Sequence, residues 1–112
     1  MEINEYQQKA IDAAFFFEKS GKIEALAYLG IALPGETGEV CEKIKKLYRD
    51  NDGELTPEIA ESIAKELGDV LWYVSVMARI LGYDMSQVAD LNLKKLADRT
   101  AKGTLHGSGD NR

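Results

Sequence analysis

Apolar residues recur at helical spacing along most of the chain. The clearest pattern runs from about Pro57 to Leu81, where apolar positions repeat three or four residues apart. They are Ala60, Ile63, Leu67, Val70, Leu71, Val74, Met77, Ala78 and Leu81. The residues that mark the predicted solvent stripe are Glu61, Lys65, Ser75 and Arg79. The pattern predicts an amphipathic helix with one face in a core.

Two shorter helices are predicted nearer the ends of the chain. The first is expected to be capped by Asn4 and to reach about Lys19. The last is expected to be capped by Asp84 or Ser86 and to run to about Lys102.

A fourth helical stretch opens at Lys22 or Ile23 and contains Pro34. Proline lacks a backbone donor and clashes with the preceding turn, so this helix is expected either to kink or to restart with Pro34 in its first turn.

These elements predict an all-α bundle of four main helices. The 112 residues fit one domain, taken as residues 1–102, followed by a glycine-rich tail at 103–112. A domain of this size has a modest core, so further burial by self-association is expected, as a homodimer or homotetramer.

Composition narrows the function classes. The net charge of -5 argues against a protein that binds nucleic acid by neutralising phosphates. Cys41 is the only cysteine, which excludes an internal disulfide. No stretch resembles a signal peptide or a membrane span, so a cytoplasmic protein without a membrane partner is expected.

Two pairs of acids stand out on the predicted helices. Glu66 and Asp69 are three residues apart and share a face that turns away from the solvent stripe. Glu36 and Glu39 repeat the spacing on the preceding helix. A partly desolvated carboxylate without a partner costs several kcal/mol, so a cation is expected beside these groups.

Antiparallel packing of the two helices would bring the four carboxylates together. Carboxylates held close raise one another's pKa unless a cation intervenes. A hard divalent metal is the simplest solution, and oxygen ligands without His or Cys suit Mg²⁺, or Mn²⁺, better than Zn²⁺.

Three motifs carry a family resemblance: G-E-x-G-E-V at residues 35–40, E-L-G-D-V-L-W-Y at 66–73 and N-x-x-K-L-x-x-R at 92–99. Together they resemble the MazG-like nucleoside triphosphate pyrophosphohydrolases, all-α enzymes with an E-E-x-x-E element followed a helix later by E-x-x-D. The resemblance runs from about Tyr6 to Arg99. Here the first acid of the signature is replaced by Gly35.

The resemblance implies Mg²⁺-dependent cleavage of a ribo- or deoxynucleoside triphosphate into the monophosphate and pyrophosphate. The expected metal ligands are Glu36, Glu39, Glu66 and Asp69. One of these acids, with Glu39 the preferred candidate, would position or deprotonate the attacking water. The choice among them stays open at this stage.

Several polar residues are candidates for contact with the substrate phosphates. Asn92 and Lys95 match family residues that approach the phosphates, and Arg99 continues their ridge. Lys43 lies one turn beyond Glu39. Arg112, with His106, is hypothesised to fold over the phosphates from the tail.

Two alternatives remain. The same fold could be restricted to dUTP or dCTP, because the motifs do not encode the base. The chain could also be a non-catalytic helical interaction module, in which the acids form salt bridges with Lys43, Lys46 or Lys95.

Overall fold

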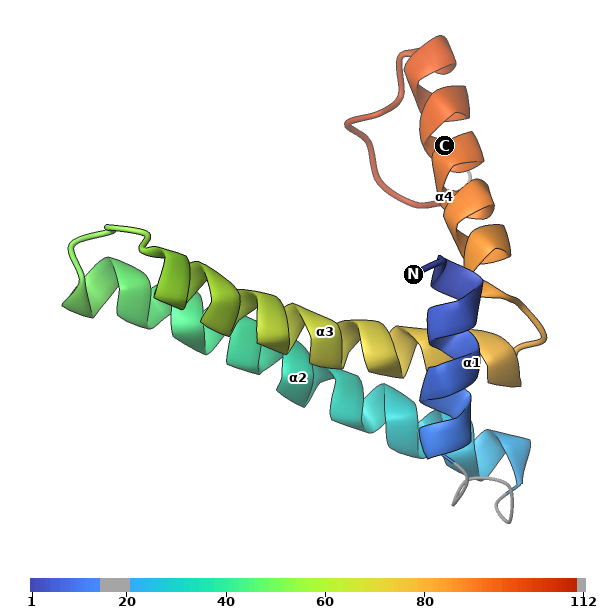
Figure 1. The fold of residues 1–112 in the computed structure, drawn as a ribbon. Helices are drawn as coiled ribbons and strands as arrows, with labels where there is room; N and C mark the ends of the chain where they lie inside the picture. The colour runs from blue at the N-terminus through green and yellow to red at the C-terminus, as the bar shows by residue number, and fades with distance from the viewer. Residues whose placement is uncertain (15–20, 111–112) are drawn as a thin grey trace.

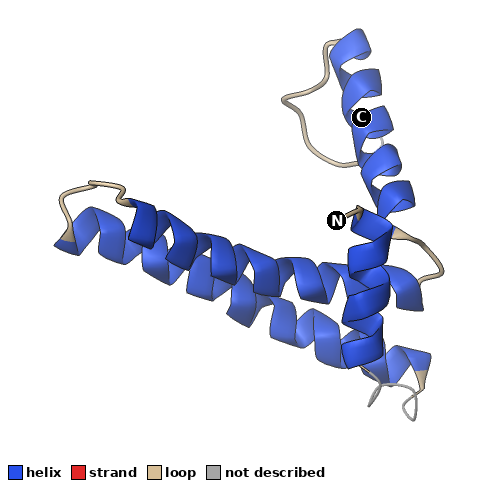
Figure 2. Cartoon of the chain, in the orientation of Figure 1, coloured by secondary structure: helices blue, strands red, loops and turns tan. Residues whose placement is uncertain are grey.

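The computed structural model describes residues 1–14 and 21–110. All regular structure in these two ranges is helical (Figure 2), which confirms the predicted fold class. The elements are α1 (Ile3–Ala13), α2 (Lys22–Asp50), α3 (Pro57–Ile80) and α4 (Met85–Lys102). The predicted extension of the first helix to Lys19 lies outside the described residues.

The two long helices, α2 and α3, pack side by side as an antiparallel hairpin (Figure 1). Their connection is short, and Thr56 caps α3 by accepting a hydrogen bond from the Ile59 N–H at 3.2 Å. Pro57 occupies the first turn, where its missing N–H costs nothing. Helix α1 crosses the hairpin at its open end, near the start of α2 and the end of α3, and α4 extends away from it.

The start of α4 follows the prediction, whereas the start of α1 does not. Asp84 forms a capping box with Gln87. Asn4 was expected to cap α1, but the helix begins at Ile3 and Asn4 lies inside it. The Asn4 Oδ1 instead accepts a hydrogen bond from the Ser86 N–H at 2.9 Å, which joins α1 to the first turn of α4.

Helix α2 passes through Pro34 without ending. Of the two outcomes expected at Pro34, a kink or a restart, the restart is therefore excluded. Proline removes the hydrogen bond to the carbonyl of Gly30, four residues earlier. Both Gly30 and Pro34 are exposed, so water can hydrate that carbonyl and the helix can continue.

The core is small and lies where α1 crosses the hairpin. Its buried apolar residues are Ala10, Ala14, Leu29 and Val76. Partly buried side chains surround them: Tyr6, Trp72, Tyr73, Met77 and Ile80. The packing of these residues holds α1 against the α2–α3 hairpin.

A buried glutamine ties three segments together at this crossing. Gln7 is 0% exposed, and its Nε2 donates to the carbonyls of Ser75 and Tyr83 at 3.0 and 3.1 Å. Its Oε1 accepts the Met85 N–H at 3.1 Å. The Gln7 amide therefore holds α1 against the end of α3 and the beginning of α4.

The predicted faces of α3 need correction. Ser75 was placed on the solvent stripe but is completely buried, because α1 packs over it. Leu67 and Leu81 were placed in the core but are 53% and 59% exposed. Periodicity marks one stripe, whereas α3 is contacted from different sides by α1 and α2.

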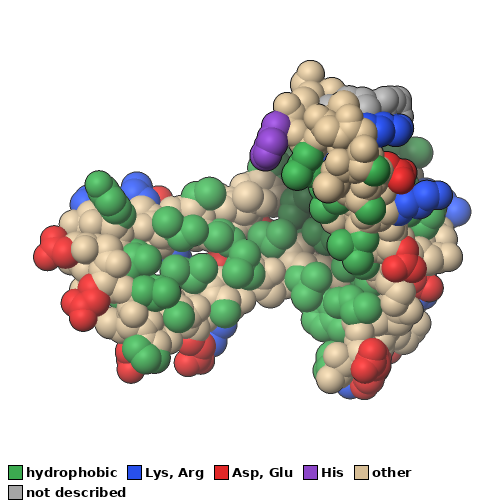
Figure 3. All heavy atoms as spheres, turned by 90° about the horizontal axis from the view of Figure 1, so that it is seen from above, with side chains coloured by type: hydrophobic (Ala, Val, Ile, Leu, Met, Phe, Trp, Pro, Cys, Tyr) green, Lys and Arg blue, Asp and Glu red, His purple; other side chains and the backbone are tan. Residues whose placement is uncertain are grey.

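Much apolar surface is left uncovered. The radius of gyration is 16.9 Å, against about 13 Å expected for a compact domain of this length. Figure 3 shows apolar side chains spread along the hairpin and over the region of α4. The exposed large ones include Ile23, Ile31, Tyr48, Leu67, Leu91 and Leu93. Within the described ranges, each helix is too short or too polar to cross a membrane.

Candidate metal and phosphate site

Three of the predicted acids converge between the two long helices. Glu36 comes from α2, and Glu66 and Asp69 come from successive turns of α3. One carboxylate oxygen of each lies within 4.8 Å of the others. The spacing of three residues puts the α3 acids on one face, and antiparallel packing brings Glu36 opposite them.

This group of acids fits a hard divalent cation. All the donors are carboxylate oxygens, the ligand type that Mg²⁺ and Mn²⁺ prefer. Glu36 and Glu66 are half-buried and Asp69 is exposed, so an ion can reach them from solvent. The three negative charges are close enough for one cation to bind them together.

Two tyrosines lie close to the acids. Burial, followed by the charge of Asp69, raises the pKa of Tyr6. Burial, followed mainly by the charge of Glu36, raises the pKa of Tyr73. Both phenols therefore stay protonated at neutral pH. Tyr6 comes near the acids because α1 crosses the hairpin, a long-range contact that leaves no spacing signal in the sequence.

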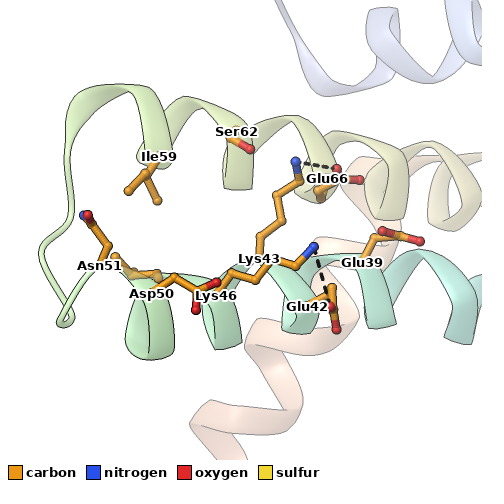
Figure 4. A pocket seen from close by; sticks show the side chains of 10 residues that line it. Glu39, Glu42, Lys43, Lys46, Asp50, Asn51, Ile59, Ser62 and Glu66 are labelled. Carbon is orange, nitrogen blue, oxygen red and sulfur yellow. Dashed lines mark ion pairs between the residues drawn. The ribbon is translucent and has the colours of Figure 1, made fainter.

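A lysine from α2 reaches the same acids. The Lys43 Nζ lies 3.3 Å from the Glu66 Oε1, and the two side chains point toward one another across a pocket of about 430 Å³ (Figure 4). Lys46, which lines the same pocket, pairs instead with Glu42 at 3.6 Å. A cation thus already approaches one of the three converging carboxylates.

Glu39 lies beside this group but outside it. Its side chain is exposed and lines the pocket with Glu66 and Lys43 (Figure 4). The structure therefore brings together Glu36, Glu66 and Asp69, and leaves Glu39 one turn further along α2. Its predicted roles as ligand and base remain predictions.

Comparison with known proteins identifies the family. The model of the MazG nucleotide pyrophosphohydrolase domain matches residues 26–104. The chain belongs to this family. A curated relative, the Gene 37 protein of Mycobacterium phage L5, is 42% identical over 114 residues and is matched along 100% of both chains. That name states no activity. No solved structure matches.

Gly35 stands at the position where the MazG signature has its first acid. It is exposed, and a Cβ atom built there would meet nothing within 4 Å. Packing therefore does not require glycine at this position. Glycine at this position lacks the oxygen donor that the acid of the signature would supply, although the helix has room for a side chain there.

The predicted phosphate contacts of this MazG chain are divided between two places. Asn92, Lys95 and Arg99 lie on α4, which leaves the hairpin near the end of α3 (Figure 1). Asp69 lies about 16 Å along α3 from that end. The structure thus does not bring the α4 residues to the acids within one chain. Arg112 lies outside the described residues.

Proposed function

We propose that this chain is a Mg²⁺-dependent pyrophosphohydrolase that cleaves a ribo- or deoxynucleoside triphosphate to the monophosphate and pyrophosphate. Membership of the MazG family supports the reaction class. The observation that carries the proposal is the convergence of Glu36, Glu66 and Asp69 within 4.8 Å on two packed helices.

Glu36, Glu66 and Asp69 would hold the metal. Bound Mg²⁺ supplies charge neutralisation for the triphosphate and a lowered pKa for water. Glu39, exposed at the adjoining pocket, accepts a proton from the water that attacks the α-phosphorus. The new bond forms from the water oxygen to the α-phosphorus, the α–β bridging P–O bond breaks, and pyrophosphate leaves with the electron pair.

On the hairpin, Lys43 is the residue proposed to contact the phosphates that leave as pyrophosphate. Its Nζ lies at the pocket and is paired with Glu66. With the Glu66 carboxylate engaged as a metal ligand, the Lys43 ammonium group would be free to turn toward a phosphate oxygen. A lysine on a flexible stem suits this exchange of partners.

The proposed assembly is a homodimer or homotetramer. The exposure of Leu67, in the middle of the predicted core stripe, supports it, because a second copy would cover this face. Assembly also offers a way for α4 of one copy to supply Asn92 and Lys95 to the acids of another. Such an assembly would join the two parts of the predicted site, the acids of the hairpin and the polar residues of α4.

The interaction module remains a second candidate because of one observation. The Lys43–Glu66 ion pair is the kind of interhelical bridge that such a module would use. An ion pair of this exposure contributes little to stability, about 0–1 kcal/mol, and does not account for the two further acids beside it.

Product analysis tests the proposal. The purified chain is incubated with a panel of ribo- and deoxynucleoside triphosphates, with Mg²⁺ or with chelator, beside the variant Glu39→Gln. Glu61→Gln, on the exposed side of α3, is the matched control. Metal-dependent release of monophosphate and pyrophosphate, lost only in Glu39→Gln, is expected, and the panel ranks the bases. No turnover of any triphosphate would favour the module.

A further inference from the structure

A second group of charges lies on α4, away from the acids of the hairpin. The segment after α4 turns back along the helix (Figure 1) and brings Asp110 onto two cations. The Lys95 Nζ and the Arg99 Nη2 each lie 3.2 Å from the same oxygen, Oδ1 of Asp110. The Arg99 Nη2 also donates to the Gly109 carbonyl at 3.0 Å.

The tail supplies acceptors for only some of the hydrogen-bond donors of Arg99. The side chain of Arg99 is only 8% exposed, and its Nε is buried and has no hydrogen-bond partner among residues 1–14 and 21–110. A buried donor without an acceptor costs about 1–3 kcal/mol. A guanidinium presents its donors in a planar fork that suits a phosphate, which offers several oxygens where the tail offers one carboxylate oxygen and one carbonyl.

The surrounding groove is cationic once Asp110 is set aside. It has a volume of about 300 Å³ and contains Lys94, Lys95, Arg99 and Lys102, with Asp98 and Asp110 as its acids. Without Asp110, four cations face one carboxylate. Hydrogen bonds from Lys95 and then Arg99 lower the pKa of Asp110, so this residue is a resident anion at neutral pH.

We propose that residues 103–110 form an intramolecular strap, in which the Asp110 carboxylate occupies an anion site made by Lys95 and Arg99 and is displaced by a phosphate or polyphosphate group. Asp110 is 81% exposed and uses one oxygen, so the strap can exchange with a competing anion. This inference rests on the proposed function in one respect: the anion that displaces Asp110 is taken to be a phosphate group.

The test uses inorganic tripolyphosphate in the presence of chelator, so that neither metal nor hydrolysis enters. Calorimetry compares the full chain with Asp110→Asn and with Asp98→Asn, which removes the same charge from the same groove without touching the strap. Loss of a competing ion pair should tighten binding about two- to fivefold in Asp110→Asn and less in Asp98→Asn. Lys95→Gln, which leaves the buried Arg99 intact, should weaken it.

Strap opening is followed separately by the amide NMR signals of residues 105–109. Saturation with tripolyphosphate should move them toward the positions that they occupy in Asp110→Asn. Equal affinities of Asp110→Asn and Asp98→Asn, unmoved tail signals at saturation, or no binding of tripolyphosphate would each overturn the strap. Failure of triphosphate hydrolysis in the product analysis would overturn the proposed function alone.

Discussion

The Lys43 ammonium lies 3.3 Å from the Glu66 carboxylate, one of the three acids that converge between α2 and α3. The lysine would therefore compete with a metal ion held at these acids, as proposed above, for one of its ligands. The two helices hold the pair in place, since each residue comes from a different long helix. This relationship makes a direct prediction about metal affinity.

Replacing Lys43 with methionine should strengthen metal binding. The substitution removes the competing charge and keeps an unbranched side chain of similar length. Partly exposed ion pairs contribute up to about 1 kcal/mol, so the dissociation constant for Mn²⁺ should fall about two- to fivefold. Calorimetry with Mn²⁺ measures it. Lys65→Met is the control, because the ion pair that Lys65 forms among the described residues is with Glu61, on the exposed side of α3. Equal affinities would contradict this competition.

Gln7→Leu should destabilise the fold. It leaves the carbonyls of Ser75 and Tyr83 and the Met85 N–H without their side-chain partner. The expected loss in the free energy of unfolding is about 3 kcal/mol. Gln8→Leu removes exposed hydrogen bonds, to Asp12 and from Arg79, so it should lower the free energy of unfolding by less, about 1 kcal/mol or below. Urea denaturation of the two variants compares them, and similar midpoints would refute the role assigned to Gln7.

The fold could largely be predicted from the sequence, because helix periodicity and capping are local. The predicted helix start near Pro57 and the cap at Asp84, one of two predicted candidates, are both found in the structure. Asn4 misled because its side chain is used by α4, a partner that the local sequence does not reveal. The burial of Ser75 likewise depends on where α1 crosses, which periodicity does not encode.

The candidate site was predictable only in part. The spacing of Glu66 and Asp69 and the antiparallel hairpin were enough to bring Glu36 to them. The two further features are long-range: Tyr6 approaches the acids from a distant helix, and Lys95 pairs with Asp110 from the tail. Their positions depend on packing between elements and leave no spacing signal.

Self-association should be measurable and should depend on the uncovered face of α3. Sedimentation equilibrium is expected to give a dimer or tetramer of the 12.4 kDa chain. Leu67→Glu places a charge on a side chain that is 53% exposed, so it should leave the isolated chain folded and shift the equilibrium toward monomer. A monomeric parent protein, or an unchanged mass in Leu67→Glu, would argue against this interface.

The Asp110 strap should respond to acid. Since Lys95 and Arg99 lower the pKa of this carboxyl, its ion pairs favour closure at every pH above the ordinary Asp value of about 3.9. That contribution is lost as the pH falls through the lowered pKa. A carboxyl NMR titration of Asp110, with Asp98 as the internal comparison, measures the value. Titration at or above the ordinary value would contradict the pairing.

The most direct test of whether the converging acids form a metal site is to measure Mn²⁺ binding by electron paramagnetic resonance. The proteins compared are the parent chain, Asp69→Asn and Glu61→Gln. Asp69 belongs to the converging acids, and Glu61 is an exposed acid on the same helix. Mn²⁺ is expected to bind the parent chain and Glu61→Gln alike and to bind Asp69→Asn at least tenfold more weakly, about 1.4 kcal/mol. Equal binding by all three proteins would show that these carboxylates do not form the metal site.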